Sequence, residues 1–251
     1  EAAQEAAIQQ AISSGQPVSF QNSQGLTVTL TVTLVNGVYE VTDPSGDVMS
    51  VQWDGAPTDP VGVVARATDY WTQIPQSLQE PRLTVIVKTG DTDKEDDLHA
   101  RADETTMTIT FYNSKNPDTG QYYTAEDNVN ERAFTHEFAH IIGPRLDRGP
   151  DILNTTGFEV PADFSFTYPH GDPRHSPTSY GDDQWHQDGI FYIRLSIEAF
   201  AEHWTLYNEA VDQGPAAMDA YRAAYPNESA WFDRHFPQAA AQRDAVYPPG
   251  P

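Results

Sequence analysis

Residues 133–143 read AFTHEFAHIIG, and the spacing within this stretch decides how the rest of the chain is interpreted. His136 and His140 are four residues apart, and Glu137 follows the first of them. On a helix such residues lie on one face, one turn apart, so both imidazoles can reach a single metal ion. Glu137 projects at a neighbouring angle, from which its carboxylate can take a proton from water. The alternative is an ordinary core helix that contains two histidines.

The composition excludes several classes of partner. The 251 residues include 37 acidic and 14 basic side chains, and the formal charge is −23. Nucleic acid and anionic membrane surfaces repel such a protein, so we expect neither as a partner. There are no cysteines, which excludes disulfides and thiolate metal ligands. No apolar run approaches the roughly 20 residues that span a bilayer, so we expect no membrane insertion. The chain begins at Glu1, and we expect a processed, secreted protein.

The N-terminal part of the sequence indicates β-structure. The sequence of residues 1–14 predicts a short helix. In residues 26–53, apolar and polar side chains alternate on both sides of an Asn36–Gly37 turn. This pattern predicts a β-meander of about three strands. The polar stretch at 54–60 is typical of a linker. We therefore predict two segments, a helix with a β-meander over 1–58 and a second domain over 59–251.

The second segment mixes both kinds of element, which predicts an α+β fold. A capping pair, Thr124 with Asp127, favours a helix start near 126, and Gly143–Pro144 favours its end. Residues 90–97 are acidic but lack the glycine and late glutamate of a calcium loop, so we interpret them as a solvated loop. The predicted helices and strands are helix 61–78, strand 82–89, strand 105–113, helix 126–142, an irregular region 144–188, and helices 190–213, 215–225 and 228–236.

A catalytic zinc site needs a third protein ligand, and the sequence offers three routes to one. The first is a residue soon after Gly143, where metzincins carry a ligand, but Leu146 holds that position and Asp147 comes one residue later. The second is the stretch SPTSYGDD at 176–183, which shares only Tyr-Gly with the aspzincin element. The third is SIEAFAEHW at 196–204, a helical pattern with two glutamates.

The third route is favoured over the other two. Glu198 and Glu202 are one helical turn apart, with Phe200 and Trp204 around them to pack the helix. Two such acids usually form a solvated face. Beside apolar side chains and downstream of His136 and His140, Glu198 can instead complete the coordination sphere, while Glu202 accepts the free N–H of a ligating histidine.

These two motifs, HEFAH and the later E-x-F-A-E, resemble the catalytic domain of the anthrax lethal factor-like metallopeptidases, a grouping that includes secreted Pro-Pro endopeptidases. The resemblance implies a zincin-like fold of the gluzincin type and a zinc-dependent endopeptidase activity on peptide or protein substrates. It implies His136, His140 and Glu198 as Zn²⁺ ligands. It also implies Glu137 as the general base and Glu202 as the partner that orients a ligating histidine.

The resemblance further implies a tyrosine that stabilises the oxyanion, before the glutamate helix. Tyr180, in TSYG, has the expected context, and Tyr192 is closer to Glu198 in sequence. We favour Tyr180. We also expect the strand at 105–113 to form the edge of the cleft and to pair with an extended substrate. The alternatives are a zincin-fold binding module that does not cut, and a peptidase that acts as a toxin or effector.

Overall fold

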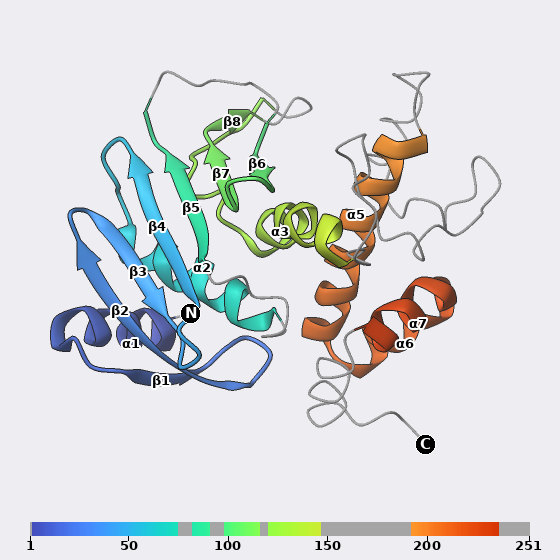
Figure 1. Cartoon of the computed structure of the whole chain (residues 1–251), viewed down its shortest axis with the longest axis horizontal. Coiled ribbons are helices and arrows are strands. Elements are labelled where there is room, and N and C mark those ends of the chain that lie inside the picture. Colours follow the sequence, from blue (N-terminus) through green and yellow to red (C-terminus); the bar gives the residue numbers. More distant parts are fainter. Residues whose placement is uncertain (1, 75–81, 91–97, 116–119, 147–191, 236–251) are drawn as a thin grey trace. The chain divides into compact units, whose positions relative to one another are not determined.

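The computed structural model describes residues 2–74, 82–90, 98–115, 120–146 and 192–235, and these form an α+β protein (Figure 1). Within these ranges it contains a mixed seven-stranded sheet, a two-stranded ribbon and six helices. The α+β class predicted from the sequence is confirmed. The chain divides into two compact units, residues 1–137 and residues 138–251, which are described separately below.

The predicted meander is present and is the first part of the large sheet. Its strands are β2 (Thr27–Val35), β3 (Val38–Thr42) and β4 (Val48–Asp54), all antiparallel to their neighbours in the meander. Asn36 and Gly37 both have positive φ, 53° and 82°, which is the backbone that a two-residue hairpin requires. A further strand, β1 (Val18–Gln21), pairs with β2 and was not predicted. The predicted N-terminal helix is α1 (Ala2–Ser14).

The sheet continues from the meander into parallel strands. A crossover through α2 (Pro60–Gln73) joins β4 to β5 (Arg82–Lys88), and these two strands are parallel. Next to β5 lies the parallel strand β7 (Thr108–Tyr112). Strands from both sides of residue 58 therefore share one sheet, in the order β1-β2-β3-β4-β5-β7-β6. The predicted division after residue 58 stays a prediction.

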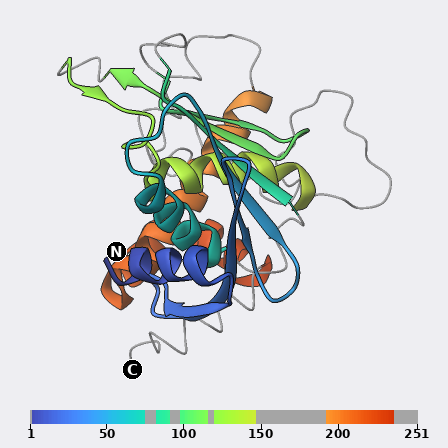
Figure 2. The same cartoon turned by 90° about the vertical axis from the view of Figure 1, so that its left-hand side faces the viewer.

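One face of this sheet forms the core of the first unit. Alternate residues along each strand are buried, as expected when one face of a sheet is covered and the other is solvated. Figure 2 shows α1 and α2 on one side of the strands, and α1 contacts α2, β1 and β2. The buried strand residues are Leu30, Val32, Val41, Met49, Val51, Leu83, Val85, Val87, Ile109 and Phe111.

The strand predicted at 105–113 is shorter than expected and does not lie at the edge. It is β7, which begins at Thr108 because the carboxylate of Asp103 accepts hydrogen bonds from the N–H groups of Thr105 and Thr106 and holds a turn there. Strand β6 (Ala100–Asp103), not predicted, pairs with β7 on the side away from β5. The prediction that 105–113 forms a cleft edge is therefore wrong, since β6 lies beyond β7 and is the terminal strand at that end of the sheet.

The helix that carries the HEFAH motif, α3 (Glu131–Leu146), is displaced from its predicted bounds of 126–142. The predicted capping pair exists: the hydroxyl of Thr124 donates to Asp127 at 2.8 Å, and the Asp127 N–H donates back at 3.1 Å. These bonds close a separate turn ahead of the helix. Gly143–Pro144 does not end α3 either, because the helix continues through both residues to Leu146.

A short ribbon precedes α3 in the chain. It consists of β8 (Ser114–Lys115) and β9 (Tyr122–Tyr123), which pair antiparallel. Residues 91–97 of the stretch interpreted as a solvated loop lie outside the described residues.

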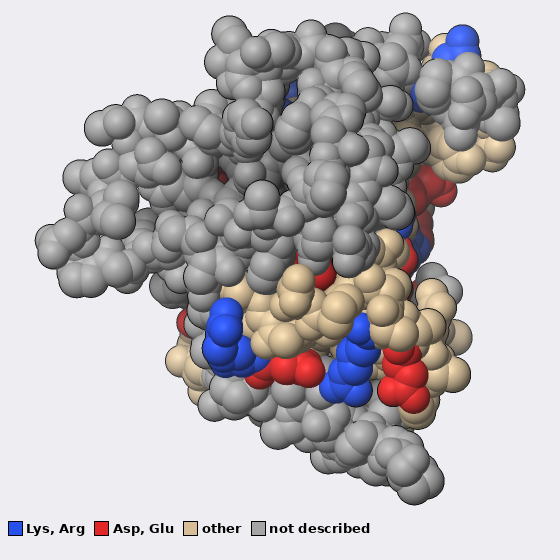
Figure 3. Space-filling model, turned by 90° about the vertical axis from the view of Figure 1, so that its right-hand side faces the viewer, with Lys and Arg blue, Asp and Glu red and all other residues tan. Residues whose placement is uncertain are grey.

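The described helices after residue 190 match their predictions closely. They are α5 (Tyr192–Gln213), α6 (Pro215–Ala224) and α7 (Pro226–His235). A buried aromatic cluster joins α5 to α7, with Phe200 and Trp204 against Trp231 and Phe232 at ring-centroid distances of 5.7–6.2 Å. On the described surface in Figure 3, acidic and basic side chains lie beside one another. Among the helices that the structure describes, none combines the length and apolar character needed to cross a bilayer.

Candidate metal centre

Asn130 fixes the start of the helix that carries the HEFAH motif. Its side-chain Oδ1 accepts a hydrogen bond from the N–H of Ala133 at 3.0 Å, and its carbonyl accepts the N–H of Phe134 at 2.9 Å. This is the hydrogen bonding of an N-cap residue, which satisfies a donor that the first turn would otherwise leave unpaired. The ring of Phe134 packs against Tyr70 of α2, with centroids 5.8 Å apart. These contacts set the position at which the histidines follow.

The burial of α3 separates the motif from the rest of the helix. His136, Glu137 and His140 are half-buried. At 3.6 residues per turn, these three positions fall within an arc of about 100° of the helix surface, on the side opposite the buried residues. The buried residues of this helix are Phe134, Thr135, Phe138, Ala139, Ile141 and Ile142.

This distribution bears on the alternative of two core histidines. A helix packed through its histidines would bury His136 and His140, and α3 instead buries aromatic and aliphatic side chains. The two histidines share the accessible side of the helix with Glu137. On an ideal helix their two positions are about 40° apart in projection, so both side chains leave the helix on the same side.

The second motif lies on α5. Glu198 and Glu202 are one turn apart on this helix, and the structure describes the side chains of α5 from Phe200 onward. Glu202 is 3% exposed, so it is not part of a solvated acidic face. Burying a carboxylate is costly unless it is hydrogen-bonded or paired. Glu202 therefore fits a role inside the protein, such as holding another polar group. The neighbouring His203 is 1% exposed, as expected for a structural residue.

The remaining predicted site residues lie outside the described residues or at the first position of α5. Tyr180 and the alternative ligand Asp147 lie outside the described residues, and Tyr192 is the first residue of α5. The boundary between the compact units falls within α3, so His136 and Glu137 end the first unit, while His140 belongs with α5 in the second. Among the side chains that the structure describes, no group of three or more metal-binding residues is assembled.

The donor set nevertheless fits zinc chemically. His136 and His140 supply imidazole nitrogens, and Glu198 supplies a carboxylate oxygen, which are the ligand types of catalytic zinc sites. The accessible arc of α3 keeps Glu137 beside the two histidines without placing it among the buried side chains. The arrangement on α3 can therefore hold a metal ion and offer a base next to it.

A residue that the sequence did not single out also positions α3. Glu126 is 4% exposed, and its carboxylate accepts hydrogen bonds from Trp53 Nε1 at 3.1 Å, from the N–H and hydroxyl of Thr58, and from the N–H of Asp59 at 3.2 Å. Burial raises the pKa of Glu126, but the hydrogen bonds from Thr58, Asp59 and Trp53 outweigh it and hold this pKa below its usual value. Nothing local in the sequence signals these partners, which are more than sixty residues away.

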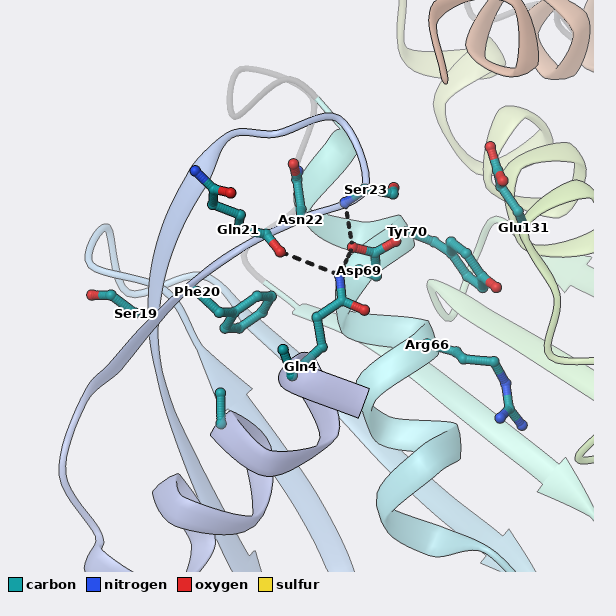
Figure 4. Close-up of a pocket in the computed structure, with 12 residues that line it drawn as sticks. Gln4, Ser19, Phe20, Gln21, Asn22, Ser23, Arg66, Asp69, Tyr70 and Glu131 are labelled. Atoms are coloured by element: carbon teal, nitrogen blue, oxygen red, sulfur yellow. Dashed lines mark hydrogen bonds between the residues drawn. The ribbon is translucent and has the colours of Figure 1, made fainter. Parts of the chain in front are cut away.

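A pocket of about 750 Å³ in the first unit is a weaker candidate for a functional site (Figure 4). Its central carboxylate, Asp69, accepts from Gln4 Nε2 at 2.6 Å, from the N–H of Ser23 at 2.8 Å and from Gln73 Nε2 at 3.2 Å. Arg66 donates to two backbone carbonyls, at 3.1 and 3.2 Å. These polar groups already satisfy one another, which indicates a structural role.

No protein-family model matches this chain, and neither a curated protein nor a solved structure matches it.

Proposed function

We propose that this protein is a zinc-dependent peptidase that cleaves peptide bonds with water. The observation that carries the proposal is the division of α3 into two sides. The phenylalanines and isoleucines of this helix are buried, while His136, Glu137 and His140 share the accessible side. Two histidines that packed a core helix would be buried, whereas a metal site requires them on the accessible side.

The proposed zinc ligands are His136, His140 and Glu198. The burial of Glu202, one turn from Glu198, supports a role for Glu202 in holding the free N–H of a ligating histidine. We propose a zincin-like fold of the gluzincin type. Its support is a mixed sheet that precedes the HEFAH helix and a later helix that carries the two glutamates.

The chemistry divides between the metal and the side chains. When bound, zinc supplies a Lewis acid for the peptide carbonyl. Glu137 accepts a proton from the attacking water as the new C–O bond forms, and it returns that proton to the leaving amine as the C–N bond breaks. Tyr180 is our proposed donor to the oxyanion that develops on the carbonyl, with Tyr192 as the alternative.

We propose that an extended peptide substrate pairs with β6, and not with β7. In the described part of the sheet, β6 has β7 on one side and no strand on the other. Arg101 and Asp103 of β6 are exposed. An open edge offers backbone donors and acceptors to an extended peptide, which adds to the sheet as one more strand.

Hydrolysis of a library of end-blocked peptides by the zinc-loaded protein tests this proposal. We expect Glu137→Ala to retain zinc, measured by elemental analysis, and to lose hydrolysis by a factor of about 10² or more. The matched control is Glu131→Ala, which makes the same chemical change on the same helix away from the motif. Full activity in Glu137→Ala would show that Glu137 is not the general base. The absence of any cleavage by the zinc-loaded wild type would favour a binding module.

A further inference from the structure

His99 stands directly before β6, and its side chain is exposed, yet two buried side chains hold it in place. Its Nδ1 lies 2.9 Å from Oγ of Ser114 and 3.2 Å from Oδ1 of Asn128. Ser114 and Asn128 are each 2% exposed. A surface histidine whose ring contacts only water needs no hydrogen bonds to buried side chains. The arrangement instead favours a ring that is kept in one orientation for binding.

The hydrogen bonds of Asn128 decide which ring nitrogen of His99 carries the hydrogen. Its Nδ2 donates to the carbonyl of Tyr112 at 2.7 Å and to Ser114 Oγ at 2.8 Å. A carbonyl only accepts, so Nδ2 must face Tyr112, and Oδ1 must face His99. Because Oδ1 also only accepts, a hydrogen bond between it and Nδ1 of His99 requires the hydrogen on Nδ1, and the Ser114 hydroxyl beside the same nitrogen then acts as a second acceptor. In the neutral ring, Nε2 is then an acceptor.

His99 lies at the end of the sheet where such folds commonly bind ligands. Lys88 and Tyr112 pair with each other, and they are the last residues of the parallel strands β5 and β7. The N–H of Tyr112 donates to the carbonyl of His99 at 3.0 Å, which places His99 next in this row. The carboxyl ends of parallel strands are the usual ligand edge of α/β sheets. The ring of Tyr123 is 6.3 Å from that of His99.

The strand edge indicates which group Nε2 accepts from. The N–H of an extended peptide is a neutral donor, and an open strand edge brings such a donor to this position. In the same row of strand ends as His99, the ammonium group of Lys88 lies 5.5 Å from the centre of the Tyr112 ring.

We propose that His99 is a substrate-binding residue whose Nε2 accepts a hydrogen bond from a backbone N–H of a peptide aligned along β6. This inference rests on the proposed function, because it takes the substrate to be a peptide on the β6 edge. It adds a contact that lies outside the motif helices. The link through Asn128 also couples this contact to the start of α3, since the N–H of Asn130 donates to the Asn128 carbonyl at 2.8 Å.

The first test is long-range ¹H–¹⁵N NMR of the His99 ring in the zinc-loaded full chain. We expect the hydrogen on Nδ1 in the free protein. We expect a change in the Nε2 shift when end-blocked peptides are added to the Glu137→Ala protein, which binds them without cutting. A hydrogen on Nε2 in the free protein, or an Nε2 shift that peptides leave unchanged, would overturn the inference.

The second test compares two substitutions. His99→Asn keeps a donor near the position of Nδ1 and removes the acceptor, so we expect KM to rise about tenfold while kcat and the melting temperature stay near wild type. His99→Gln places an amide oxygen near the position of Nε2 and should recover part of the loss. An unchanged KM in His99→Asn contradicts the inference while leaving the peptidase proposal intact.

Failure of the peptidase proposal has a different signature. If the zinc-loaded wild type cleaves no peptide, the proposed function fails. Peptide binding is then compared directly between the Glu137→Ala protein and the same protein carrying His99→Asn. Weaker binding in the second protein supports the His99 contact, and equal binding excludes it.

Discussion

The indole Nε1 of Trp53 donates a hydrogen bond to the carboxylate of Glu126 across 3.1 Å, which ties the end of β4 to the turn that leads into α3. The same carboxylate accepts from Thr58 and Asp59, at the start of the crossover through α2. One buried acid therefore joins two connections that are far apart in the sequence. The position of the HEFAH helix depends on this junction as well as on its own cap.

Glu126→Gln should lower the free energy of unfolding by about 2 kcal/mol. The amide can still accept from one donor, but its NH₂ group then faces backbone N–H groups that have lost their acceptor. Urea denaturation checks this value. The matched control is Glu104→Gln, an exposed position, where we expect a change within about 0.5 kcal/mol. Equal effects at the two positions would show that the junction contributes little.

The stabilising effect of Glu126 should also depend on pH. Its pKa is lowered in the folded protein, so its contribution is complete above the pKa of the unfolded carboxyl. The contribution is lost as the pH falls through the lowered folded value. The stability difference between wild type and Glu126→Gln should therefore shrink on acidification, measured by urea denaturation at a series of pH values. A difference that grows as the pH falls would show that folding raises the pKa of Glu126 and does not lower it.

Asn130→Ala should lower the free energy of unfolding by about 1 kcal/mol, because it removes the side-chain acceptor for the Ala133 N–H. Asn130→Asp keeps an acceptor and adds a negative charge at the helix N-terminus, so we expect it to match or exceed the wild type. Thermal and urea unfolding distinguish the two variants. If both lose the same stability, the cap is not what defines the start of α3.

Thr68→Val should raise the free energy of unfolding by about 1 kcal/mol. Thr68 lies in α2 and is 0% exposed, and its hydroxyl has no hydrogen-bond partner within the described structure. Valine has nearly the same shape and removes this buried polar group. Differential scanning calorimetry measures the effect. A loss of stability would mean that the hydroxyl has a partner in the native protein.

Zinc should stabilise the protein when it is added after chelation, by about 4 kcal/mol at a free zinc concentration a thousandfold above the dissociation constant. His136→Ala should abolish this gain because it removes one of the two imidazoles on α3. His99→Asn, which changes a histidine off that helix, should retain it. Thermal unfolding with and without zinc compares the three proteins. A gain that survives in His136→Ala would place the metal elsewhere.

The elements that sequence patterns predicted well are those specified by neighbouring residues. The Asn36–Gly37 hairpin has the positive φ angles that its two residue types favour, and strand β5 follows its alternation within one residue. The start of α3 was mispredicted because Thr124 and Asp127 carry a true capping signal for a separate turn. Asn130, six residues later, is the actual cap.

The features that the sequence did not reveal depend on contacts between distant segments. Strand β6 is the four-residue stretch ARAD, which has no apolar alternation of its own and forms through pairing with β7. The Glu126 junction and the His99 support join residues from separate loops. The candidate metal ligands on α3, His136 and His140, could be proposed from the sequence because their spacing is local to one helix. The third ligand, Glu198, lies on a different helix, and its assignment stays a prediction.

An anomalous-difference map from crystals of the zinc-loaded full chain, collected on both sides of the zinc absorption edge, would locate the metal ion itself. We predict a peak at about 2.0–2.2 Å from a nitrogen of His136, a nitrogen of His140 and a carboxylate oxygen of Glu198. A peak with Asp147 in place of Glu198 would contradict the gluzincin assignment. No peak at the two histidines would contradict the metal centre itself.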